Sequence, residues 1–215
     1  DAGAAGLFGP AAGGWAAAFA AAGFAPDDVD AVLVSHMHPD HVGGMVADGA
    51  AVFPRAAVKV HALDLAYWTN AAEQARAPDF AAAWFDAARD VKRLYGERLE
   101  TFAGEAALAP GVVAVPLPGH TPGHTGFMIE SAGERLFLWT DVTDFTALQL
   151  NAPERTLIFD IDPVAGAASR RRAIALAASE RLRVGGAHIP FPGFGHIGGR
   201  EGAFRFVPSE WDHAL

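Results

Sequence analysis

The sequence contains no cysteine among its 215 residues. Disulfide bonds and thiolate metal ligands are therefore excluded, and the redox compartment stays open, because a protein without thiols can work on either side of a membrane. The sequence also has no apolar run of membrane-spanning length and no basic-then-apolar signal segment at its start. We expect a soluble protein without a membrane partner, and the choice between a cytoplasmic and a periplasmic or secreted location stays open.

Positive charge is scarce as well. Lys and Arg total 16 against 25 Asp and Glu, which gives a formal net charge of −9. This balance argues against a nucleic-acid partner, because such proteins need a basic surface to displace counterions from phosphates. Charged residues make up only 19% of the chain and apolar residues 51%, which is a globular composition. The length suits one domain with a well-buried core, and we expect a single domain over 1–215.

Apolar runs of strand length alternate with helical patterns along the chain. We expect helices over 14–22, over 63–95 with an interruption near Pro78, and over 168–180. The expected strands cover 31–35, 57–61, 112–115, 126–130, 135–139, 156–159 and the residues just before 185. Within 63–95 the expected core contacts are Trp68, Phe80, Trp84, Phe85, Val91 and Leu94. This order predicts an α/β (α+β) class with mixed sheets covered by helices.

Histidine is the residue type that carries chemistry here. Histidines occupy positions 36, 38, 41, 61, 120, 124, 188, 196 and 213, and most follow a strand-like run in a glycine- and proline-rich loop. Loops at strand ends are where a rigid scaffold can bring side chains to one point. The densest group is SHMHPDHVGG at 35–44.

That segment has an interpretable geometry. Residues two apart in an extended segment point the same way, so His36 and His38 can grip one ion together. Pro39 keeps His38 out of the helical region and is itself a favoured first helical residue, so the chain can turn there. The turn carries the side chains of Asp40 and His41 to a second position nearby, and the glycine pair after them allows close backbone approach. A lone histidine is more often structural. This segment, however, offers more ligands than a single ion would use, whereas two ions would use all of them.

At these residues the sequence resembles the metallo-β-lactamase superfamily, whose signature H-x-H-x-D-H is His36–His41 here. DAG at 1–3 is similar to the D-x-G turn that precedes the signature, PGHTPGH at 118–124 to the loop of the third histidine, and LFLWTDVTD to the turn of a bridging aspartate. AHIPFPGFGHI at 187–197, FDIDP with the arginine-rich helix after it, and FVPSEW resemble the methyl parathion hydrolase-like or lactonase-like branch. The resemblance implies an αββα sandwich that here lacks the N-terminal strands before the D-x-G turn.

Carried over residue by residue, the resemblance implies two metal sites. One ion takes His36, His38 and His120, the other takes Asp40, His41 and His188, and Asp141 bridges both together with a hydroxide. Asp141 as the bridge and Asp40 as a terminal ligand are the expected catalytic carboxylates. Imidazole and carboxylate suit two divalent ions, with zinc as the first expectation and manganese, cobalt or iron as alternatives.

Other residues have supporting or open roles. We expect Asp1 and His124 to orient ligands or fix their loops. His196 competes with His188 for the last ligand position, and His188 is preferred because it directly follows a strand. His61 is expected to be structural and His213 exposed. Trp68, Phe191 and Phe194 are candidates for an apolar leaving-group pocket, although core packing is the more frequent role of a residue like Trp68.

The implied function is a dinuclear metal-dependent hydrolase that cleaves an ester, lactone or phosphotriester of a small molecule, with a homodimer as an open expectation. The bridging hydroxide would attack while one ion polarises the oxygen under attack. A glyoxalase II-like thioesterase and a β-lactam hydrolase are alternatives, although no basic C-terminal cluster is present and cysteine-free β-lactamases lack the bridging aspartate. Alternatives of another class are a mononuclear iron persulfide dioxygenase and a truncated, non-catalytic domain.

Overall fold

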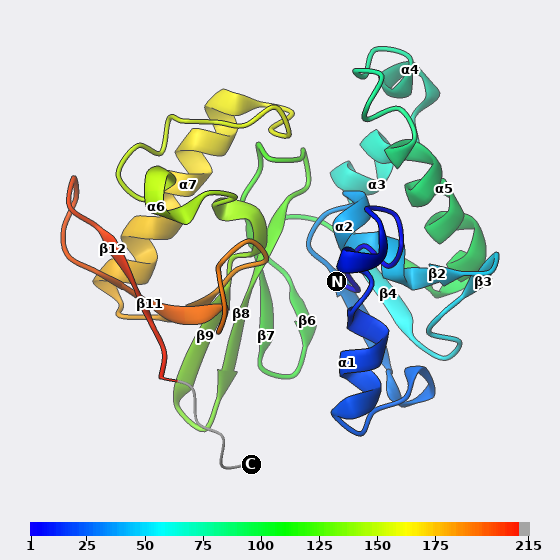
Figure 1. Ribbon diagram of the computed structural model, residues 1–215, viewed down its shortest axis with the longest axis horizontal. Coiled ribbons are helices and arrows are strands. Elements are labelled where there is room, and N and C mark those ends of the chain that lie inside the picture. The colour runs from blue at the N-terminus through cyan, green and yellow to red at the C-terminus, as the bar shows by residue number, and fades with distance from the viewer. Residues whose placement is uncertain (211–215) are drawn as a thin grey trace. The chain divides into compact units, whose positions relative to one another are not determined.

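The computed structural model describes residues 1–210, so His213 and the other residues of 211–215 lie outside the described residues. The chain divides into two compact units, Asp1–Ala103 and Gly104–Leu215. Each unit contains a β-sheet with helices packed against it (Figure 1). The expected mixed α/β class is confirmed, and the expectation of a single domain stays a prediction. Among the described residues, no helix combines the length and apolar character needed to cross a bilayer.

The first unit is built on a three-stranded parallel sheet in the order β1-β4-β5. Its strands are β1 Ala31–Val34, β4 Ala57–His61 and β5 Leu99–Phe102, and a separate small hairpin comprises β2 Val46–Ala47 and β3 Ala50–Ala51. The strands expected over 31–35 and 57–61 are confirmed. Because the strands are parallel, the residues that follow β1 and β4 leave the sheet at the same edge.

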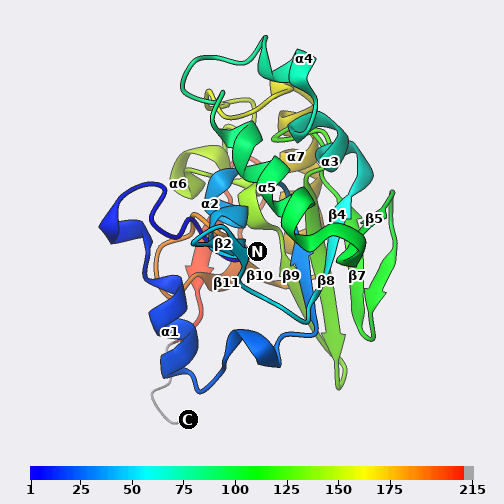
Figure 2. The ribbon, with the colours of Figure 1, turned by 90° about the vertical axis from the view of Figure 1, so that its right-hand side faces the viewer.

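Helices cover this sheet: α3 contacts β4 and β5, and α5 packs against α2 and α3 (Figure 2). The helices are α1 Trp15–Ala21, α2 Pro39–Val42, α3 Ala62–Trp68, α4 Ala71–Gln74 and α5 Trp84–Tyr95, with 3-10 turns η1 Pro10–Ala12, η2 Pro26–Asp28, η3 Gly43–Met45 and η4 Gly96–Arg98. The helical stretch expected over 63–95 is confirmed, and its break falls around Pro78.

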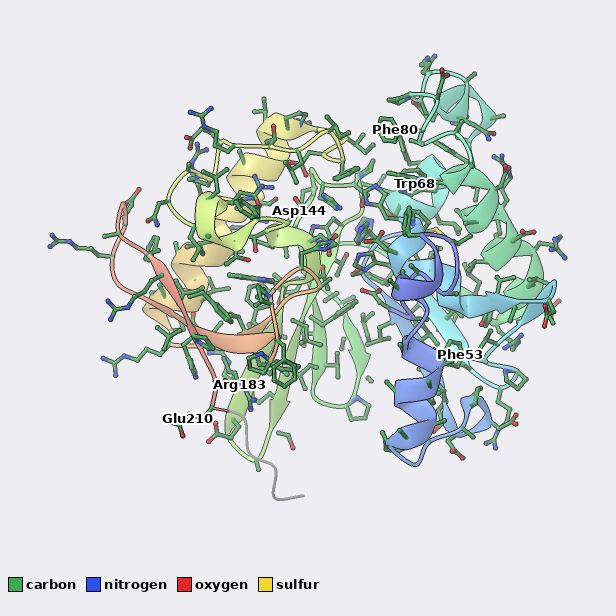
Figure 3. The ribbon with its side chains drawn as sticks, in the orientation of Figure 1. Phe53, Trp68, Phe80, Asp144, Arg183 and Glu210 are labelled. Atoms are coloured by element: carbon green, nitrogen blue, oxygen red, sulfur yellow. The ribbon has the colours of Figure 1, made fainter. Side chains whose placement is uncertain are left out.

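The core of the first unit lies between the sheet and α5. Phe85, Val91 and Tyr95 form a buried stripe along α5, at the spacing that keeps side chains on one helix face. Trp68 is buried in the same core, with Trp84 and Leu94 partly buried against it. The expectation that Phe80 is a core residue is wrong, because its side chain is 47% exposed (Figure 3). Phe80 precedes α5 and so lies outside the periodic face of that helix.

The second unit contains a seven-stranded sheet in the order β12-β11-β10-β9-β8-β7-β6. Its strands are β6 Ala107–Ala109, β7 Val112–Pro116, β8 Thr125–Ser131, β9 Glu134–Leu138, β10 Arg183–Gly185, β11 Phe194–Gly198 and β12 Arg205–Pro208. Neighbours are antiparallel except β9 and β10, which are parallel. The segments after β9 and after β10 therefore leave the sheet at one edge.

Helix α7, Pro163–Ser179, connects the parallel strands β9 and β10 across one side of this sheet (Figure 1). Its start is well specified, because the Asp162 side chain accepts from the backbone N–H groups of Val164 and Ala165 and Pro163 occupies the first turn. Ile174 packs with Phe137 in the core of the second unit. Two short helical turns, η5 Thr140–Val142 and α6 Thr146–Gln149, precede it.

The strands expected over 112–115, 126–130 and 135–139 and before residue 185 are confirmed, as are the helices over 14–22 and 168–180. The strand expected over 156–159 is wrong, because this segment is an irregular loop. Its apolar composition imitates a strand, but the neighbours of β9 in the sheet are β8 and β10, and Ile158 is 75% exposed.

Close backbone contact holds the start of the chain against the turn after β1. The N–H of Ala2 donates to the carbonyl of His41, and the N–H of Gly44 donates to that of Gly3, both at 2.8 Å. A Cβ on Gly44 would collide with the carbonyl oxygen of Ala2. Glycine is therefore required here for the close approach expected from the sequence.

Gly44→Ala is expected to lower the free energy of unfolding by about 1–3 kcal/mol, because the added methyl must displace the Ala2 backbone. Urea unfolding followed by circular dichroism measures the change. Gly14→Ala is the matched control, because φ is −72° there and an added Cβ meets nothing within 4 Å. The control should be neutral or stabilising by up to about 1 kcal/mol. Equal stability of the two variants would contradict the close approach.

Candidate metal centre

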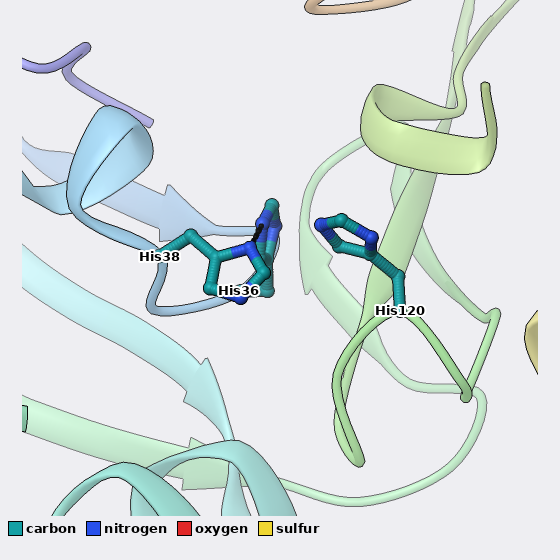
Figure 4. A group of neighbouring side chains, drawn as sticks. All are labelled: His36, His38 and His120. Atoms are coloured by element: carbon teal, nitrogen blue, oxygen red, sulfur yellow. Dashed lines mark hydrogen bonds between the residues drawn. The ribbon is translucent and has the colours of Figure 1, made fainter. Parts of the chain in front are cut away.

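Strand β1 presents the first pair of ligands. It ends at Val34, and His38, four residues later, is extended, with φ and ψ of −62° and 149°. The ring nitrogens His36 Nε2 and His38 Nδ1 lie 3.0 Å apart, as the dashed line in Figure 4 marks. Both rings are buried. Two imidazole nitrogens this close can both reach one cation.

The chain then turns into α2 with Pro39 in its first turn, as the sequence predicts. The turn brings Asp40 Oδ2 to 3.5 Å from His41 Nε2. The rings of His36 and His41 lie with centroids 4.0 Å apart, so the two pairs of donors are adjacent within the first unit. Four potential ligands thus come from a six-residue stretch.

The partly exposed carboxylate of Asp1 holds this stretch in place. Asp1 accepts from the N–H of Ser35 at 2.8 Å and from its hydroxyl at 2.7 Å, and its Oδ2 lies 2.8 Å from His41 Nδ1. The hydroxyl of Ser35 also lies 3.0 Å from His36 Nδ1. Each of these histidines is thereby held at Nδ1, which leaves Nε2 as the atom that can bind a metal.

Asp64, which the sequence reasoning missed, is fully buried and accepts from the backbone N–H of Met37 at 2.7 Å. Its only sequence signal is a lone acidic residue in the otherwise apolar ALDLAYW. Trp68, labelled in Figure 3, lies in the core, and the centroid of its ring lies 5.0 Å from that of His38 in an edge-to-face arrangement. It therefore packs against a candidate ligand, and its part in a substrate pocket stays a prediction.

The second unit presents its own donors at the ends of β7, β9 and β10. His120 lies on the loop between β7 and β8 (Figure 4). Asp141 lies in η5 directly after Thr140, whose φ of 50° is unusual for a non-glycine residue. Asp141 Oδ2 is 3.0 Å from His188 Nε2 and 3.4 Å from His120 Nε2. One carboxylate oxygen therefore lies between two imidazoles.

Two further carboxylates of this unit were missed by the sequence reasoning. Asp160 Oδ1 is 2.9 Å from His120 Nδ1. Asp144, labelled in Figure 3, has an oxygen within 4.8 Å of donor atoms of both His120 and Asp141. Its Oδ2 is buried without a hydrogen-bond partner among the described residues, and burial raises the pKa of this carboxyl. The only sequence signals were the second aspartate of DVTD and the acids of FDIDP.

The electrostatics at His120 favour a cation. Burial alone would lower the pKa of this imidazole, but its hydrogen bonds to Asp141 and Asp160 raise the pKa to about 10. For the carboxyl of Asp160 the signs are reversed. Burial alone would raise its pKa, but its contacts with His120 and Arg170 outweigh burial and lower the pKa. Carboxylates that stabilise a proton here would stabilise a divalent ion in its place. The imidazole and carboxylate donors of both units therefore fit divalent metals.

The remaining histidines have structural partners. His124 Nδ1 donates to the carbonyl of Leu117 and its Nε2 lies 2.7 Å from the Thr140 hydroxyl, which ties the His120 loop to the turn of Asp141. His196 Nδ1 lies 3.1 Å from the carbonyl of Leu182, so its ring is turned to the backbone of its own sheet. His61 accepts from the N–H of Leu63 and caps α3. Of the two competing histidines, His188 is the one beside Asp141.

The other two predicted pocket residues lie near His188 in the sequence. Phe191 is 74% exposed in the loop between β10 and β11. Phe194 begins β11, and the guanidinium of Arg183 lies over its ring at 5.4 Å. Phe191 is thus largely exposed, and Phe194 lies against the guanidinium of Arg183. Their part in substrate binding stays a prediction.

Comparison with known proteins identifies this arrangement. A family model described as "Metallo-beta-lactamase superfamily" matches residues 5–188. The crystal structure of hydrolase AbOPH in the beta lactamase superfamily superimposes with a TM-score of 0.89 at 29% identity, over 99% of this chain and 75% of its own. The expected fold family is thereby confirmed.

Two further solved structures share the fold. AidC, a dizinc quorum-quenching lactonase in complex with a product, matches with a TM-score of 0.89 at 24% identity, over 98% of this chain and 75% of its own. A probable metal-dependent hydrolase from Staphylococcus aureus matches with a TM-score of 0.66 at 25% identity, over 80% of this chain and 58% of its own.

In metal-free protein, the ring of His120 is expected to stay protonated at pH 8, because its pKa is raised from 6.5 to about 10. This protonation stabilises the fold fully below pH 6.5, and the stabilisation is lost as the pH rises through about 10. Histidine-ring NMR measures the titration, and His120→Asn identifies the resonance by removing it. A ring that is neutral at pH 8 would show that the carboxylates do not hold a cation here.

His188→Ala is expected to lower the number of metal ions bound per chain, because the imidazole beside Asp141 is removed. His196→Ala is the matched control and should bind as much metal as the wild type, since its imidazole is hydrogen-bonded to the backbone carbonyl of Leu182 rather than to Asp141. Elemental analysis after equilibration with zinc measures both. Loss of metal in the His196 variant alone would reverse the assignment.

Proposed function

This chain belongs to the metallo-beta-lactamase superfamily, and from that premise we propose that it is a metal-dependent hydrolase acting on a small molecule. AbOPH, at 29% identity, is named a hydrolase, and AidC is named a dizinc lactonase. The proposed reaction is cleavage of an ester or lactone, with phosphotriesters as a further substrate class.

The proposal assigns two divalent ions, zinc first, to the donors of the two units. His36, His38 and His120 would hold one ion, and Asp40, His41 and His188 would hold the other. Asp141 would be the ligand that the two ions share. When bound, such a pair of ions supplies Lewis acidity and lowers the pKa of a water molecule that attacks the substrate.

The carrying observation is the position of Asp141 Oδ2 between His120 and His188. A carboxylate with an imidazole on each side suits a ligand shared by two cations, because each imidazole would complete a different ion. Burial keeps water from competing with it, since Asp141 is almost fully inaccessible. Two other carboxylates, Asp1 and Asp160, orient histidines through Nδ1 of His41 and His120.

The proposed substrate carries no negative charge apart from the charge that develops on the oxygen under attack. Phe191, exposed in the loop after His188, supplies an apolar surface for an acyl or aryl group. The net charge of −9 disfavours polyanions such as nucleic acids. These features favour esters and lactones with apolar substituents.

The purified protein is expected to contain close to two zinc, manganese, cobalt or iron ions per chain and to hydrolyse a nitrophenyl ester or an acyl-homoserine lactone. Asp141→Asn should lose more than about a hundredfold in kcat/KM, because a directly bound ligand matters more than the residues that orient ligands. Elemental analysis and a hydrolysis panel that adds methyl paraoxon, nitrocefin and lactoylglutathione measure both.

Asp27→Asn is the matched control, because Asp27 is an exposed carboxylate of η2. It should keep the metal content and activity of the wild type. Full activity of Asp141→Asn would overturn the proposed function. One iron per chain together with oxygen consumption on a persulfide would replace it with a dioxygenase.

A further inference from the structure

A buried arginine at the centre of α7 touches the supports of two proposed ligands. Arg170 is 1% exposed, and its guanidinium donates to three acceptors on three segments. Nε donates to the carbonyl of Val142 at 2.6 Å, Nη1 to that of Pro153 at 2.7 Å, and Nη2 to Asp160 Oδ2 at 3.3 Å. A buried guanidinium is costly unless its donors are paired in this way.

The first branch leads to His120. Asp160 Oδ1 accepts from His120 Nδ1 at 2.9 Å while Oδ2 faces Arg170, so the carboxylate spans the two side chains. A hydrogen on Nδ1 fixes the tautomer and leaves the Nε2 lone pair for a metal. The backbone supports the same contact, because the N–H of Ile161 donates to the carbonyl of His120 at 3.0 Å.

The second branch leads to Asp141. Val142 directly follows Asp141 in η5, a turn that contains the positive φ of Thr140 and the non-helical φ and ψ of Asp141. A turn of this kind persists only where its surroundings hold it. The 2.6 Å bond from Arg170 to the Val142 carbonyl is such a hold.

We propose that Arg170 is a positioning residue that sets the geometry of two metal ligands at once, His120 through Asp160 and Asp141 through the carbonyl of Val142. The proposal rests on the proposed function, because it takes these two residues as ligands. A rigid helix thereby places both ligands relative to each other. Lysine cannot replace this arginine, because an ammonium cannot reach three acceptors in one plane.

The chain provides matched controls on the same helix. Arg172 donates to the carbonyl of Pro116 at 2.6 Å and so ties α7 to the end of β7, without touching Asp160. Arg171 pairs at 3.8 Å with Glu154, and both side chains are more than half exposed. Arg172→Lys therefore tests for general loosening of the helix, and Arg171→Lys tests for the loss of a surface guanidinium.

The experiment uses cobalt(II) alone as the probe, with no substrate. Arg170→Lys is expected to weaken cobalt binding about 10–100-fold and to change the visible ligand-field spectrum, whereas both controls keep the wild-type affinity and spectrum. Wild-type affinity and spectrum in Arg170→Lys would overturn the proposal. If Arg170→Lys does not fold, Asp160→Asn decides instead. The same weakening in that variant supports the proposal, and unchanged binding overturns it.

Hydrolysis assays on the same preparations separate the two proposals. Wild-type protein that binds cobalt but cleaves no ester, lactone or phosphotriester would refute the proposed function and leave the cobalt result on Arg170 standing. Wild-type protein that binds no cobalt would refute both. If the site is active, kcat in Arg170→Lys should fall more than KM changes, because displaced ligands affect the reacting centre more than substrate binding.

Discussion

The candidate centre depends on one constraint, which is that each ligating imidazole must be held at one nitrogen for the other to bind a cation. For three of the proposed ligands the chain meets it with a different partner at Nδ1. Ser35 lies against Nδ1 of His36, Asp1 against that of His41 and Asp160 against that of His120. In every case the outer partner is itself held by a second hydrogen bond, so ring orientation is set before a metal arrives.

Two backbone positions, Gly44 and Thr140, are needed to hold Asp1 and Asp141 in place. Gly44 lies so close to Ala2 that no side chain fits, and this packing seats Asp1 beside His41. Thr140 takes a positive φ so that the chain can turn after β9 and present Asp141. Gly44 lies in the turn η3 after α2, and Thr140 lies in the turn η5 after β9, so both positions are in short turns beside the proposed ligands.

The sequence predicted those parts of the candidate site whose geometry depends on residues close together in the chain. His36, His38 and His41 were predicted as a group because extended backbone, Pro39 and the glycine pair determine their geometry within ten residues. Asp160 and Arg170 were not assigned roles, because their value lies in contacts with residues 40 and 28 positions away. The apolar segment 156–159 predicted a strand, since composition alone does not reveal whether a neighbouring strand is there to pair with it.

The loop over 156–159 also shows why an irregular segment is useful at this place. A strand there would have its backbone groups committed to a sheet ladder. As a loop, the segment leads into backbone bonds from Ile161 to His120 and from Asp162 to Gly119. Asp162 then caps α7, so residues 160–162, which support His120 and its loop, lead directly into the helix that carries Arg170. The same short segment therefore supports His120 and fixes the start of α7, so a change that disturbs one would also disturb the other.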